Sequence, residues 1–64
     1  MRQPDINRAK RALEHVEAAM TLLESIKWEN VSGEEYTLKQ SCNRLLKDTE
    51  GTIQDLVRIG GGKI

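Results

Sequence analysis

The stretch VSGEEY, Val31 to Tyr36, decides the fold of this 64-residue chain. Ser32 and Glu35 form the S-x-x-E pattern of a capping box. In that pattern the serine hydroxyl accepts from the glutamate amide, and the glutamate side chain accepts from the serine amide. Val31 and Tyr36 have the spacing of a hydrophobic staple, and Glu34 adds negative charge at the positive end of the helix dipole. The stretch therefore predicts that one helix ends, the chain turns and a second helix begins.

Apolar residues before this turn recur at spacings of three and four, which is the a/d rhythm of a helix that packs against other helices. Pro4 or Asp5 suits the start of this helix, proline in the first turn or aspartate as the cap. The pattern predicts a helix from about residue 5 to residue 29 and a turn at 30–32. Its seam consists of Ile6, Ala9, Leu13, Val16, Met20 and Leu23.

The same rhythm continues after the turn and predicts a second helix over about residues 33–59. Three glycines then predict a flexible tail at 60–64. Gly51 is either a tolerated glycine that allows close approach of the helices, or a break after which Thr52 caps a short last helix. The predicted seam of the second helix consists of Leu38, Cys42, Leu45, Thr49, Thr52, Leu56 and Ile59.

A short connection makes the two helices antiparallel neighbours, so the predicted fold is an all-α helical hairpin with its two seams in contact. Each helix also carries a flanking apolar row that the other helix cannot cover. We therefore expect two hairpins to dimerise into a four-helix bundle; the alternative is that a different protein covers this surface. The expected oligomer interface consists of Ala12, Ala19, Leu22, Ile26, Leu46 and Ile53.

The size of the chain supports the same expectation. At 7.3 kDa it is a single domain at most, and chains this short are marginally stable without a disulfide, a metal or a partner. Cys42 is the only cysteine, and a zinc site is not expected because His15 is the only histidine. No cofactor is expected either. Association remains as the source of additional stability.

Charge and hydropathy narrow the class of protein. Ten basic and ten acidic residues give a net charge of zero, which does not indicate a strongly basic nucleic-acid binder. No apolar run has the length of a membrane span, no secretory signal is apparent, and the lone thiol suggests a cytoplasmic setting. The open end of the hairpin is rich in basic residues and the tip in acidic ones, which favours a dimer with the two hairpins antiparallel.

The residues that could carry chemistry are few, and the chain is not expected to be an enzyme. His15 lies off the seam, without a nucleophile or a second histidine, and is expected on the surface. Cys42 falls on the seam and is expected to be a buried structural thiol. The GGGK sequence at 60–63 lacks the spacing of a phosphate-binding loop.

Two groups of residues are candidates for binding other molecules. Trp28 and Tyr36 lie at the turn, where they either pack the tip or anchor a partner protein. Arg8, Lys10 and Arg11 avoid the apolar seam and could contact the phosphates of a nucleic acid when paired across a dimer.

In length, in its two helices with one short turn, and in heptad seams that favour an antiparallel dimer, the chain resembles the Rop family of small plasmid copy-number regulators. The resemblance covers the architecture of nearly the whole chain and implies a nucleic-acid-binding regulator. The residues themselves favour a small homo-oligomeric protein–protein interaction module, an adaptor or inhibitor of the kind that phages and other mobile elements encode.

Overall fold

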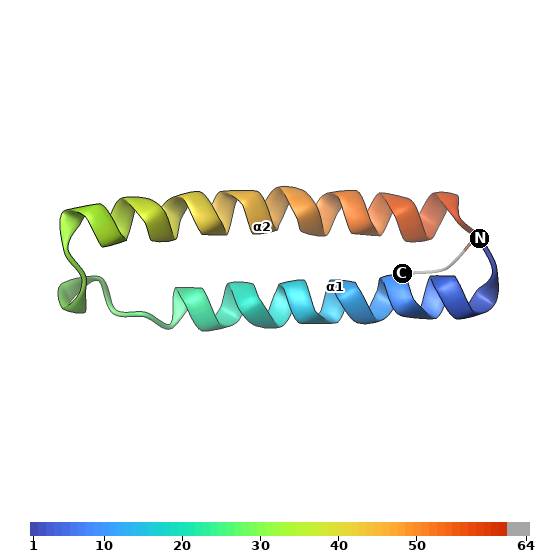
Figure 1. Ribbon diagram of the computed structural model, residues 1–64, viewed down its shortest axis with the longest axis horizontal. Helices are drawn as coiled ribbons and strands as arrows, with labels where there is room; N and C mark the ends of the chain where they lie inside the picture. Colours follow the sequence, from blue (N-terminus) through green and yellow to red (C-terminus); the bar gives the residue numbers. More distant parts are fainter. Residues whose placement is uncertain (62–64) are drawn as a thin grey trace.

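The computed structural model describes residues 1–61, apart from the side chain of Trp28. Helix α1 spans Gln3–Glu24, a short 3-10 helix η1 spans Trp28–Asn30, and α2 spans Gly33–Ile59. The two long helices lie side by side in opposite directions, with η1 in the connection (Figure 1). The hairpin measures 45 × 14 × 14 Å. The predicted all-α hairpin is therefore confirmed, while positions 62–64 of the predicted tail lie outside the described residues.

The predicted capping box is present at the start of α2. The Oγ of Ser32 accepts from the Glu35 amide at 3.1 Å, and Oε1 of Glu35 accepts from the Ser32 amide at 2.9 Å. Glu34 adds a second negative charge to the first turn, and Arg58 puts a positive charge in the last. Both ends of α2 thus complement the helix dipole.

Helix α1 ends at Glu24, five residues before the predicted end at residue 29. The Ser25 hydroxyl donates to the Leu22 carbonyl at 2.6 Å. The amide of Ile26 donates to the carbonyl of Leu23, three residues back instead of four. These local bonds satisfy carbonyls of the last turn and stop the helix, although the apolar rhythm continues to Ile26.

The start of α1 has no side-chain cap. Arg2 is in the capping position with an extended backbone, and Pro4 lies in the first turn, so the interpretation of Pro4 as a first-turn proline is the correct one. Asp5 also lies in the first turn, where its carboxylate accepts from Arg8 at 3.0 Å. The first turn of α1 therefore lacks the side-chain hydrogen bonds that stabilise the first turn of α2.

The hydrophobic core of the described residues is small. Only Ile6, Leu13 and Val57 are buried, and Val57 alone is fully inaccessible. The rest of the α1 seam is half-buried. On α2 the half-buried positions that lead to Val57 include Leu46 and Ile53. A single hairpin thus holds little apolar surface away from water, as expected for two helices without a third layer.

Gly51 does not break α2, which is continuous from Gly33 to Ile59. A Cβ atom added at Gly51 would meet nothing within 4 Å. The suggestion that this glycine permits close approach to the other helix of the hairpin is therefore wrong. Space is available there for a side chain.

The open end of the hairpin brings the two ends of the described chain together. The amino group of Met1 donates to the carbonyl of Gly60 at 3.1 Å. Gly61 follows with a positive φ of 98°, a conformation that glycine adopts without strain. This turn closes the end of the rod opposite η1 (Figure 1).

Candidate interaction surface

The most exposed apolar side chains of α2 form one row along the helix. Leu38, Leu45, Leu56 and Ile59 are 61%, 66%, 50% and 81% exposed. Cys42, Thr49 and Thr52 continue the row between them, so that its spacing is four, three, four, three, four, three. This is the rhythm of a complete heptad seam. We call these seven residues the outer row: Leu38, Cys42, Leu45, Thr49, Thr52, Leu56 and Ile59.

The prediction that this row contacts α1 is wrong. The neighbouring row, which includes Leu46, Ile53 and Val57, is turned toward α1 instead. The apolar stripe on α2 is wide enough to contain two heptad rows one residue apart. Spacing alone cannot decide which of them faces inward. Polar members of the inner row, including Lys39, Asn43 and Glu50, are also half-buried.

Cys42 belongs to the outer row and is exposed, so the prediction of a buried thiol is wrong.

The inner row contains a polar residue that weakens its contact with α1. The Oδ1 atom of Asn43 is buried without a hydrogen-bond partner in the described part of the chain. Burial of an unpartnered acceptor costs free energy, so the contact between the helices is imperfect near this residue.

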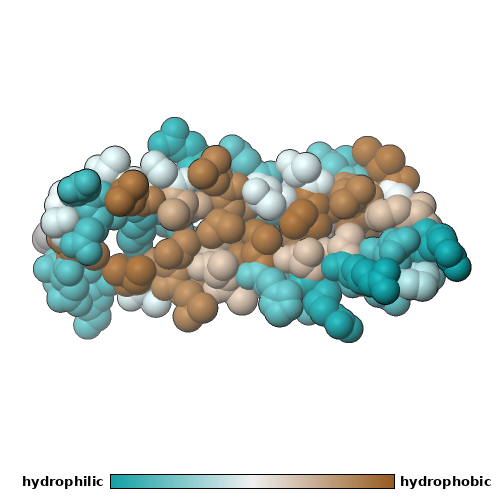
Figure 2. Space-filling view, viewed as in Figure 1, coloured by the Kyte–Doolittle hydropathy of each residue, from teal (hydrophilic) through white to brown (hydrophobic). Residues whose placement is uncertain are grey.

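Helix α1 contributes further apolar residues to the surface of the hairpin. Leu22 is 69% exposed and Ile26 42% exposed; Ala12 is exposed and Ala19 half-buried. On a helical wheel, Ala12, Ala19 and Ile26 lie on the same side of the hairpin as the outer row. Figure 2 shows a face on which hydrophobic side chains run over both helices along most of the rod.

The six residues expected in the oligomer interface therefore divide into two groups. Ala12, Leu22 and Ile26 are accessible on the surface. Ala19, Leu46 and Ile53 are half-buried, and the last two belong to the inner row of α2. The outer row is missing from the predicted interface because its residues are predicted to lie between the two helices.

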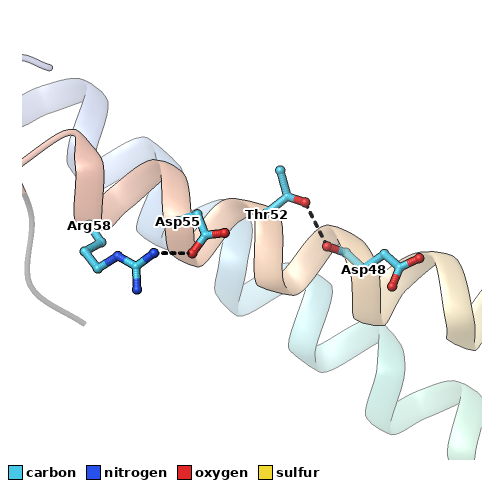
Figure 3. Close-up of polar contacts among 4 residues, drawn as sticks. All are labelled: Asp48, Thr52, Asp55 and Arg58. Atoms are coloured by element: carbon cyan, nitrogen blue, oxygen red, sulfur yellow. Dashed lines mark hydrogen bonds and ion pairs between the residues drawn. The ribbon is translucent and has the colours of Figure 1, made fainter.

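The threonines of the outer row are compatible with an apolar contact. The hydroxyl of Thr49 donates to the Leu45 carbonyl at 2.8 Å. That of Thr52 donates to the Asp48 carbonyl at 2.9 Å, and Figure 3 shows this second bond. Because each hydroxyl proton is already bound within the helix, burial of these side chains leaves no donor unsatisfied.

Both ion pairs of the described residues lie near the open end of the hairpin. The only ion pairs within residues 1–61 join Arg8 to Asp5 at 3.0 Å and Arg58 to Asp55 at 2.7 Å, and both are exposed pairs three residues apart (Figure 3 shows the second). Lys10 and Arg11, the other two candidates for nucleic-acid contact, are in no ion pair within that part of the chain. Pairs of this kind contribute well under about 1 kcal/mol each.

The residues at the tip give little support for a separate binding site. Tyr36 is 44% exposed, and its hydroxyl accepts from Nε2 of Gln40 at 3.1 Å. Trp28 lies in η1, and its side chain is outside the described part of the structure. Val31 is half-buried. That Trp28 and Tyr36 either pack the tip or anchor a partner protein stays a prediction.

His15 is exposed, as predicted. Among the described residues, no group of three histidine, cysteine, aspartate or glutamate residues could hold a metal ion. A shallow hollow beside Ser41, Arg44 and Leu45 is lined by α2 alone. Neither helix, over the part of the chain described, is both long enough and apolar enough to traverse a bilayer.

Comparison of the chain with family models, with curated proteins and with solved structures gives no match. The class of the protein therefore follows from its own geometry. It is a small all-helical hairpin with an apolar surface that extends over both helices.

Proposed function

We propose that this chain is a self-associating helical interaction module and that a second copy covers its apolar face. One observation carries the proposal: among the described side chains of residues 1–61, which leave out Trp28, three apolar side chains are buried while eight large ones are exposed. The exposed set consists of Met1, Leu22, Ile26, Tyr36, Leu38, Leu45, Leu56 and Ile59.

Much of the apolar surface of a single hairpin stays in contact with water. Burial of a large apolar side chain stabilises a fold by roughly 1.5–3 kcal/mol, and the exposed leucine and isoleucine side chains of the outer row leave that stabilisation unused. Covering the outer row with another hairpin would add several buried leucine and isoleucine side chains per chain, which supports association.

The role of such an assembly is that of an adaptor or inhibitor, in which the bundle presents its polar outer surface to another protein. The proposal includes no catalytic step. An exposed thiol at Cys42 is chemically suited to a reducing compartment, and we place the protein in the cytoplasm on that basis.

The mass in solution tests this proposal. We expect light scattering on the full chain to give at least twice 7.3 kDa. Leu45→Glu, which puts a charge in the outer row, should shift the mass to that of one chain and reduce the helical circular dichroism signal. Lys47→Glu is the matched control, since Lys47 is exposed on another side of α2 and its replacement should change neither quantity. A fully helical wild-type monomer at micromolar concentration would refute the proposal, and a monomer that binds a different protein through the outer row would refute the choice of partner.

The basic open end favours a second candidate function, a regulator that binds nucleic acid. Arg8 is paired with Asp5, but Lys10 and Arg11 are in no ion pair within residues 1–61 and are available to phosphates. Binding of this kind should weaken steeply with salt, and Arg11→Ala should reduce it without changing the oligomeric mass. If RNA and DNA leave the mobility of the wild-type protein unchanged at low salt, this candidate is wrong.

A further inference from the structure

We draw no further inference here: the strongest candidate, the apolar surface patch that the outer row of α2 forms beside Ala12 and Ile26 of α1, carries nothing beyond the proposed self-association, because nothing in the structure shows what covers it.

Discussion

Gly51 is the residue at which a single substitution gives the clearest change in stability. It lies in the interior of α2, where glycine is unfavourable relative to alanine, and a Cβ atom there would meet nothing within 4 Å. We expect Gly51→Ala to raise the free energy of unfolding by about 0.5–1 kcal/mol, measured by urea unfolding. The oligomeric mass should not change, because Gly51 lies off the outer row.

Gly60 provides the contrasting control for that measurement. A Cβ atom at Gly60 would lie 2.9 Å from the carbonyl oxygen of Leu56 and would crowd the side chain of Met1. We expect Gly60→Ala to give no gain in stability. Equal gains at both positions would mean that backbone entropy of the unfolded chain, rather than helix propensity and space, controls the result.

Ser32 is the residue that fixes where α2 begins. Its hydroxyl accepts from the Glu35 amide, one of the donors that the first turn of a helix leaves without a partner. Ser32→Ala should lower the free energy of unfolding by about 1 kcal/mol, again measured by urea unfolding. Ser32→Asp should retain most of the stability, and a loss equal to that of alanine would argue against the capping role.

At the scale of the helices, the ends of α2 were predictable and the end of α1 was not. The capping box marks a helix start by two residues three positions apart, so the stretch VSGEEY was enough to predict where α2 begins. Helix α1 ends where the Ser25 hydroxyl donates to the Leu22 carbonyl. A serine within a run of regularly spaced apolar residues does not by itself predict such a hydrogen bond. The sequence also could not assign the inner row of α2. Two rows one residue apart, with Leu45 in one and Leu46 in the other, fit the same periodicity.

The first turn of α2 should respond to acid through Glu35. The pKa of its carboxyl lies below the ordinary 4.5, mainly because it accepts from the Ser32 backbone amide and also through the Ser32 side chain. A lowered pKa in the folded state means that this stabilisation is complete above about pH 4.5. It is lost as the pH falls through the lowered pKa. Chemical-shift titration should therefore show the Ser32 amide signal moving toward its unfolded position in this range.

Two substitutions isolate that effect. Glu35→Gln keeps an oxygen that can accept from Ser32 but cannot titrate, so the acid-dependent shift of the Ser32 amide should disappear. Glu34→Gln removes a neighbouring charge that makes no side-chain hydrogen bond within residues 1–61, and the shift should persist. Persistence of the shift in Glu35→Gln would assign it to a different group.

At the scale of the whole molecule, the sequence predicted the hairpin from its short turn and the excess apolar surface from the width of the apolar stripes. Which residues make up that surface required the structure. The exposure of Leu45 and the burial of Val57 show which row of α2 faces outward. Thr49 fits in that row because its hydroxyl already donates to the Leu45 carbonyl in the same helix.

Stability should depend on protein concentration if two chains fold together. Each hundredfold rise in concentration should stabilise the assembly by about 2.7 kcal/mol, and the midpoint of thermal unfolding should rise with it. The measurement is a series of calorimetric or circular dichroism melts at increasing concentration. A midpoint that stays constant would identify the hairpin as a self-sufficient monomer.

The hydrogen bond between the Met1 amino group and the Gly60 carbonyl brings the two ends of the described chain close enough for a circular permutation. A few glycines could join the two ends, and a new opening could be made between Lys27 and Val31, outside both long helices. Such a circular permutant would begin with α2 and finish with α1 while retaining every contact along the rod. Its architecture depends on how the helices lie together and not on which of them the ribosome makes first.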